Sequence, residues 1–124
     1  MATHKGAVLV VDDDVDMREA LHDALAAEGY EPVEAHDGTQ ALDYLRSKPL
    51  PSVILLDWNM APMNAPQFMA ELANEDALLS SVPVVLLTAD ARAPDKAKSH
   101  PFSGYLMKPV SLDALLEVLE HYCG

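Results

Sequence analysis

The segment Ala7–Asp14, with the sequence AVLVVDDD, sets the fold class of this 124-residue chain. Five apolar residues stand directly before three aspartates, and no polar residue interrupts the apolar run. A short continuous run of this kind is typical of a strand that is covered on both faces of a parallel sheet. Four further strand-like runs follow it. We therefore predict strands at Ala7–Val11, Glu31–Ala35, Ser52–Leu56, Val82–Leu87 and Gly104–Met107.

Helical signals separate these strands. Apolar residues recur with helical spacing over Met17–Leu25, and Gly29 is placed to end that helix. The segment Asp37–Gln40 predicts a turn and a capping box at the start of a second helix. A third helix is predicted around Phe68–Leu72, and a last one follows Ser111, which can cap it.

The segment Ala91–Ser99 carries the weakest helical signal, because Pro94 delays the start of the helix and Pro101 ends it early. Strand and helix nevertheless alternate five times through short connections. This order predicts an α/β fold with a parallel five-stranded sheet and helices on both faces. No repeat, linker or low-complexity tract interrupts the pattern, so residues 1–124 are predicted to form one doubly wound domain.

The composition excludes several classes of function. Twenty acidic residues against eight lysines and arginines give a net charge of −12, which disfavours direct binding to nucleic acid. The single cysteine, Cys123, excludes a disulfide framework and a cysteine-rich zinc site. The five glycines form no phosphate-binding loop for a nucleotide. No apolar run approaches the ~20 residues of a membrane span, and no secretory signal is recognisable, so we expect a cytoplasmic protein without a membrane partner.

Polar side chains stand where four of the predicted strands end. The first strand runs into Asp12–Asp14, the third is followed by Asp57, the fourth by Thr88, and the fifth by Lys108. The carboxyl ends of parallel strands meet at one edge of a sheet, where open α/β folds bind their ligands. We therefore expect these carboxylates, the hydroxyl and the ammonium group to share one site.

Such a cluster predicts a bound cation. Two carboxylates 4 Å apart repel by about 4 kcal/mol at an effective dielectric constant of 20. One lysine cannot balance three aspartates, whereas Mg²⁺ is commonly held by one or two carboxylates together with water and phosphate. A carboxylate that remains free can act as a nucleophile and form an aspartyl phosphate, whose oxygens the hydroxyl and the ammonium group would hold.

Simpler interpretations exist for each residue alone. Asp14 or Asp16 can serve only as a helix N-cap, Thr88 as a turn residue, and Lys108 as a solvated strand end. A calcium loop that begins at Asp12 is disfavoured, because its sixth position is not glycine. These interpretations explain the residues one by one, but not their coincidence at four strand ends.

The chain resembles the response regulator receiver domains of two-component signalling, and the similarity extends over nearly its whole length. The segment from Asp57 to Met60 is particularly similar to the chemotaxis-type regulators. The motifs that carry the resemblance are Val10–Asp14, Asp37–Gly38 with Ala41–Leu42, Leu55–Asp57, Leu87–Ala89 and Tyr105–Pro109. The resemblance implies a flavodoxin-like (βα)5 fold with the strand order 2-1-3-4-5.

The resemblance also implies a function. Asp57 would accept a phosphoryl group from the phosphohistidine of a histidine kinase or phosphotransfer protein. The domain would catalyse only its own phosphorylation and dephosphorylation, and would switch its contacts with a downstream protein target that the sequence does not identify. It would thus be a signalling domain rather than an enzyme acting on other substrates.

Individual roles follow from the same resemblance. Asp12 and Asp13 would hold Mg²⁺, with Asp13, Asp57 and the backbone carbonyl of Asn59 as the direct ligands. Lys108 would bridge to the phosphoryl group and Thr88 would move toward it. Two further residues, Asn59 and Asp90, would tune dephosphorylation, and Tyr105 would be the switch aromatic, the alternative being a half-buried tyrosine without such a role.

Two departures from the family pattern stand out. After Met60 the family usually continues Pro-x-Met-Asp-Gly, whereas this chain has Ala61–Pro66 with the sequence APMNAP. The interval from Thr88 to Lys108 is a couple of residues short, and Pro101-Phe102 replaces the customary Gly-Ala. We therefore expect an atypical short fourth helix, and a changed surface where the family usually contacts its output partners.

Two other classes of function remain open from the sequence. The first is an aspartyl-phosphate phosphatase, which would need a general acid two residues after Asp57, where this chain has Asn59, and a cap domain. The second is an interaction module that no longer uses phosphorylation. The presence of Asp57, Thr88 and Lys108 favours the phosphoacceptor over both.

Overall fold

The computed structural model describes residues 6–47, 49–99 and 102–123. Within these residues, five parallel strands form one sheet in the order β2-β1-β3-β4-β5, as the resemblance implied. The strands are β1 (Ala7–Val11), β2 (Glu31–Ala35), β3 (Val53–Asp57), β4 (Val84–Thr88) and β5 (Gly104–Met107). The third and fourth strands therefore include Asp57 and Thr88 as their last residues, one position later than predicted.

Helices occupy the intervals between the strands, with one addition. In the described part of the chain they are α1 (Val15–Ala27), α2 (Gly38–Ser47), α3 (Ala65–Ala73), α4 (Ala77–Ser80), α5 (Ala93–Ser99) and α6 (Leu112–Cys123). The single turn α4 was not predicted, and it forms because Asp76 accepts hydrogen bonds from the backbone of Leu78 and Leu79. Helix α5 has only seven residues, so the expectation of a short helix before the last strand is confirmed. Pro101, which was expected to end it, lies outside the described residues.

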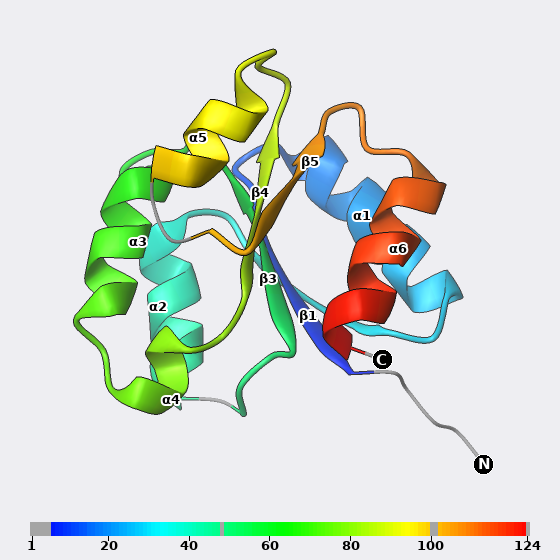
Figure 1. Ribbon diagram of the computed structural model, residues 1–124. Coiled ribbons are helices and arrows are strands. Elements are labelled where there is room, and N and C mark those ends of the chain that lie inside the picture. Colours follow the sequence, from blue (N-terminus) through cyan, green and yellow to red (C-terminus); the bar gives the residue numbers. More distant parts are fainter. Residues whose placement is uncertain (1–5, 48, 100–101, 124) are drawn as a thin grey trace.

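The sheet separates two apolar cores, because alternate residues of each strand point to opposite faces. Helices α2, α3, α4 and α5 lie on one side, and α1 and α6 lie on the other (Figure 1). On β1, for example, Leu9 and Val11 pack into the first core, with Phe68 of α3. Val8 and Val10 pack into the second. Burial on both faces explains why the central strands read as continuous apolar runs.

Polar caps fix where several helices begin and end. Asp14 caps α1, Ser111 accepts a hydrogen bond from the backbone of Ala114, and Gly29 follows α1 with a φ of 90°, all as expected. At the start of α2, the Asp37 carboxylate accepts from the Gln40 N–H. The Gln40 side chain accepts from His36 rather than from the cap residue itself, so the predicted capping box is present in a shifted form.

No helix in the described ranges is long and apolar enough to cross a membrane.

Candidate functional site

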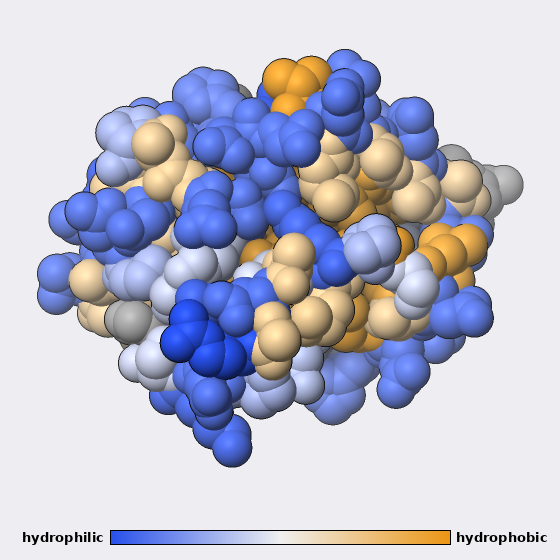
Figure 2. Space-filling view, turned by 90° about the horizontal axis from the view of Figure 1, so that it is seen from above, coloured by the Kyte–Doolittle hydropathy of each residue, from blue (hydrophilic) through white to orange (hydrophobic). Residues whose placement is uncertain are grey.

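The polar residues predicted at the strand ends lie together at the carboxyl edge of the sheet. Backbone hydrogen bonds continue past the regular ladder and fix these ends: Asp12 donates to Ala35, and Lys108 donates to Thr88. Hydrophilic residues cover much of the face seen from this edge, and apolar residues are gathered near its centre and over the right half of the view (Figure 2).

Lys108 joins two of the carboxylates directly. Its Nζ donates to Asp12 Oδ2 at 3.0 Å and to Asp57 Oδ1 at 3.1 Å. The other oxygen of Asp12 accepts from the backbone N–H of Asp14 at 2.9 Å, so both oxygens of this fully buried side chain are engaged. Three strand ends are thereby connected through one ammonium group. The pairing is buried on the carboxylate side, which strengthens it relative to an exposed ion pair.

The environment of Asp57 favours its neutral form more than water does. Burial and the neighbouring charge of Asp12 raise the pKa of Asp57 to about 6, although Lys108 and the backbone N–H of Asn59 act in the opposite direction. For Lys108, burial alone would lower the pKa, but its bonds to Asp12 and Asp57 raise it above the ordinary value. At pH 7 the site therefore holds an ionised Asp57 beside a protonated Lys108.

Three carboxylates of this site are close enough to share a cation. One oxygen each from Asp12, Asp13 and Asp57 lies within 4.8 Å of the others. Lys108 contacts Asp12 and Asp57, while Asp13 is exposed, so three negative charges face one positive charge. A set of oxygen donors with surplus negative charge suits a hard divalent cation such as Mg²⁺. The residues present therefore fit the metal that the sequence predicted.

The remaining predicted residues lie on or just after strands β3, β4 and β5. Thr88 is buried at the end of β4, and its Oγ accepts from the backbone N–H of Asp90 at 3.1 Å. Asn59, two residues after Asp57, is exposed. Its backbone carbonyl lies just beyond the end of β3 in the chain. Tyr105 on the edge strand β5 is 41% exposed, so its ring faces outward.

Two residues near the site were missed by the sequence analysis. Arg18 of α1 donates to the backbone carbonyl of Asp12 at 2.7 Å and pairs with Glu34 of β2. Lys96 of α5 contacts Asp90 and the ring of Trp58. Both lie in helices, where a charged residue is expected on the face exposed to solvent. The sequence pattern therefore did not indicate a role for either at the site.

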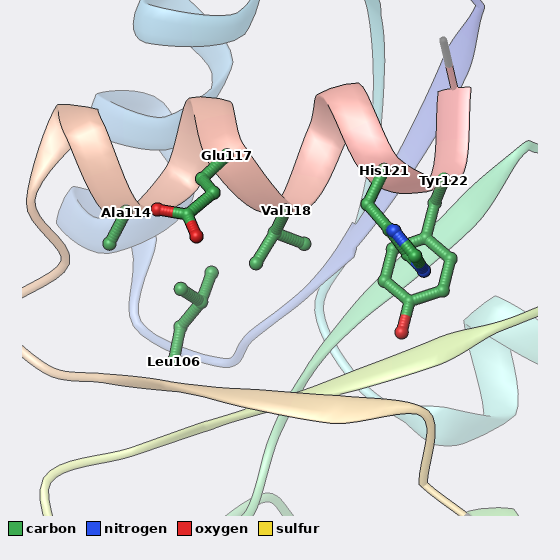
Figure 3. A pocket seen from close by; sticks show the side chains of 6 residues that line it. All are labelled: Leu106, Ala114, Glu117, Val118, His121 and Tyr122. Carbon is green, nitrogen blue, oxygen red and sulfur yellow. The ribbon is translucent and has the colours of Figure 1, made fainter.

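Two hollows differ in their relation to this cluster. A hollow of ≈ 460 Å³ adjoins it and is lined by Asp13, Trp58, Asn59 and other residues of the loop after β3. A second hollow of ≈ 450 Å³ lies between β5 and α6, with Leu106, Glu117 and His121 in its wall (Figure 3). The lining of this second hollow contains none of the clustered carboxylates, whereas that of the first includes Asp13.

Comparisons with known proteins agree with this arrangement. The family model of the response regulator receiver domain matches residues 8–120. Chemotaxis protein CheY1 of Helicobacter pylori is 30% identical over 94% of this chain and 96% of its own length. The structure of chemotaxis response regulator CheY4 of Vibrio cholerae superimposes with a TM-score of 0.85 at 29% identity, covering 97% of this chain and 99% of that one.

A third relative is longer than the present chain. The phosphate regulon transcriptional regulatory protein PhoB of Escherichia coli is 35% identical over 84% of this chain. The match spans only 45% of PhoB, so this chain corresponds to about half the length of that regulator.

Proposed function

Because this chain belongs to the response regulator receiver domain family, we propose that it is a phosphoacceptor domain in which Asp57 receives a phosphoryl group from a phosphohistidine. The donor would be a histidine kinase or a histidine phosphotransfer protein. The observation that supports this proposal best is the Asp57 carboxylate itself, which is buried, bonded to Lys108 and still ionised at neutral pH. An ionised carboxylate at a ligand-binding sheet edge has the character of a nucleophile.

The proposed step is a transfer between two side chains. An oxygen of the Asp57 carboxylate attacks the phosphorus and forms an acyl phosphate, while the bond from phosphorus to the donor imidazole nitrogen breaks. The electron pair of that bond returns to the nitrogen, which takes up a proton. Phosphoryl transfer of this kind depends mainly on positioning and on stabilising the charge of the moving group.

Lys108 and Thr88 are the residues suited to that stabilisation. The Lys108 ammonium group already contacts Asp57, so it can pair with an oxygen of the phosphoryl group once that group is attached to Asp57. The Thr88 hydroxyl accepts from Asp90 and retains its own proton for donation to a second phosphoryl oxygen. Tyr105, at the exposed edge, is proposed to change its packing when Thr88 moves.

Asp12, Asp13 and Asp57 with the carbonyl of Asn59 are proposed to hold Mg²⁺. When bound, this ion supplies positive charge that offsets the carboxylates and the developing charge on the phosphoryl oxygens. The surplus of negative charge in the cluster supports the assignment.

Loss of the phosphoryl group is proposed to depend on the residues at the rim. Asn59 is exposed beside Asp57, and Asp90 is half-buried beside Thr88, so both border the path of an attacking water molecule. The output is proposed to be a change of contact with another protein.

The test of the proposed function is direct phosphorylation. We expect the protein in Mg²⁺ and acetyl phosphate to gain the mass of one phosphoryl group, and Asp57→Asn or removal of Mg²⁺ to abolish the gain. The matched control is Asp23→Asn, which removes an exposed carboxylate in α1. An unmodified wild-type protein, or equal modification of the Asp57→Asn variant, would overturn the proposal.

A further inference from the structure

Lys96 of α5 contacts residues that follow two of the strand ends at the site. Its Nζ lies 3.4 Å from Asp90 Oδ2, beyond β4, and 4.3 Å from the centroid of the Trp58 ring, beyond β3. Its side chain is only 18% exposed, which is unusual for lysine. A cation over an indole ring is attracted by the negative face of that ring. Lys96 thus connects α5 to both strands that carry Asp57 and Thr88.

Asp90 brings a fourth carboxylate to the rim of the site. Its backbone N–H donates to the Thr88 hydroxyl, so its position is tied to that of a proposed phosphoryl ligand. The backbone N–H of Arg92, together with the Arg92 and Lys96 side chains, holds the pKa of Asp90 below its ordinary value. Asp90 is therefore an anion at neutral pH, two residues after Thr88.

Trp58 connects Lys96 to the other side of the site. It directly follows Asp57, and its backbone N–H donates to Leu87 of β4. Its side chain lines the ≈ 460 Å³ hollow together with Asp13 and Asn59. The ring centroid lies 6.2 Å from that of Phe102, so the indole also packs against the segment before β5. The orientation of this ring therefore shapes the space beside Asp57.

Two other cations of this region are less constrained than Lys96. Arg92 also pairs with Asp90, but its side chain is 75% exposed, and exposed ion pairs contribute little. Lys98 lies two residues further along α5 and is exposed. A helix of seven residues has little stability of its own, so contacts such as those of Lys96 decide where it lies.

We propose that Lys96 is a positioning residue for the phosphorylation of Asp57. It offsets the charge of Asp90 and fixes the Trp58 ring, so that an anionic phosphodonor meets less repulsion on its way to Asp57. The inference rests on the proposed function and adds to it a role for a cation other than Lys108. Because like charges at an approach path lower the association rate, Lys96 affects the encounter with the donor more than the subsequent transfer.

The experiment measures the rate of phosphorylation by acetyl phosphate at saturating Mg²⁺, as a function of donor concentration. The variants are Lys96→Met, which keeps the apolar stem, Lys96→Arg, which keeps the charge, and Lys98→Met, which removes the same charge from an exposed position. We expect Lys96→Met to lower the apparent second-order rate constant of phosphorylation about threefold to tenfold. This constant is the slope of the rate against donor concentration when the donor concentration is low. Lys96→Arg should recover most of the loss, and Lys98→Met should stay within about twofold of wild type.

Two further readouts separate positioning from a general structural defect. The Trp58 fluorescence of the unphosphorylated protein should change in Lys96→Met more than in Lys98→Met, because the Lys96 Nζ lies 4.3 Å from the centroid of the ring. In an Asp90→Asn background, Lys96→Met should have a smaller effect, because the charge that Lys96 offsets is absent. Lys96→Gln provides a second neutral variant if Lys96→Met fails to fold.

The outcomes distinguish this inference from the proposed function. If wild type is phosphorylated and Lys96→Met reacts as fast as wild type, or if Lys98→Met loses as much as Lys96→Met, the role of Lys96 is overturned. If wild type is not phosphorylated at all, the proposed function itself fails.

Discussion

Asp57 combines burial with charge, and the combination costs stability. The residue is 6% exposed, its carboxylate interacts with that of Asp12, and it accepts a hydrogen bond from the ammonium group of Lys108. A pKa of about 6, compared with 3.8 for the free side chain, means that the folded protein binds the Asp57 proton more tightly than the unfolded chain does. Functional residues often carry such an energetic cost because their chemistry requires it.

The sign of the resulting pH dependence follows from proton binding. Between pH 3.8 and about 6 the unfolded chain has lost the Asp57 proton while the folded protein retains it. The free energy of unfolding should therefore decrease as the pH rises through this window, by about 1–3 kcal/mol for this residue, and then level off.

Replacement of Asp57 by asparagine should remove that decrease. Without divalent cations, we expect Asp57→Asn to be more stable than wild type at pH 7 by about 1–3 kcal/mol, and nearly equal to it below pH 4. Urea unfolding at both pH values measures the difference. Asp23→Asn, an exposed substitution, should show no such gain; equal stability of Asp57→Asn and wild type at pH 7 would contradict the argument.

At the scale of single elements, the loop from β3 to α3 depends on one cap. Asn64 accepts from the Gln67 N–H and donates its own N–H to the Gln67 side chain, both at 2.9 Å. This capping box starts α3 at Ala65, within the segment in which the chain departs from the family pattern. It therefore anchors the altered loop beside Asp57 to the helix that follows.

Loss of this cap should destabilise the fold without touching the acidic cluster. Asn64→Ala should lower the free energy of unfolding by about 1 kcal/mol, because the first turn of α3 loses an acceptor for its N–H groups. Urea unfolding measures the change. Asn64→Ser, which can still cap, should recover much of it, and an unchanged stability of Asn64→Ala would show that water replaces the cap fully.

A close contact between α2 and Met63 also fixes this loop. A Cβ atom at Gly38, the first residue of α2, would lie 2.9 Å from Cγ and Sδ of Met63. The second helix and the altered loop therefore approach closely only because position 38 has no side chain.

For the whole molecule, the dominant property is the excess of negative charge. A net charge of −12 on 124 residues disfavours the compact state through self-repulsion, and the acidic cluster concentrates that charge at one edge of the sheet. A cation that binds the folded cluster but not the unfolded chain should stabilise the protein by mass action.

Magnesium ions should therefore raise the unfolding temperature. At a concentration of 100 times the dissociation constant, binding contributes about 2.7 kcal/mol, which corresponds to a shift of about 10 °C for a chain of this size. Thermal unfolding by circular dichroism measures the shift. Sodium chloride at equal ionic strength should produce a much smaller one, and Asp13→Asn, which removes an exposed carboxylate of the cluster, should reduce the magnesium effect.

The strand positions, the parallel sheet and the convergence of Asp12, Asp57 and Lys108 were predictable from residue order alone. Buried parallel strands need continuous apolar runs, and the geometry of such a sheet brings their carboxyl ends to one edge. The strand order came from family resemblance, because strand pairing depends on contacts between distant segments that local patterns do not encode. The extra turn α4 was missed for a related reason, since a single turn has no periodicity to detect.

The partners of Arg18 and Lys96 were decided only by the tertiary structure. Both are charged residues in helices, where the sequence shows a solvated face, and only the packing of α1 and α5 against the strand ends directs them to Asp12, Asp90 and Trp58. The pKa of Asp57 likewise follows from its burial and from Asp12 and Lys108, which are distant in the chain. The chemical type of each site residue could be taken from the sequence. Its distances to other groups, its burial and its ion pairs are set only when segments that are remote in the chain pack together.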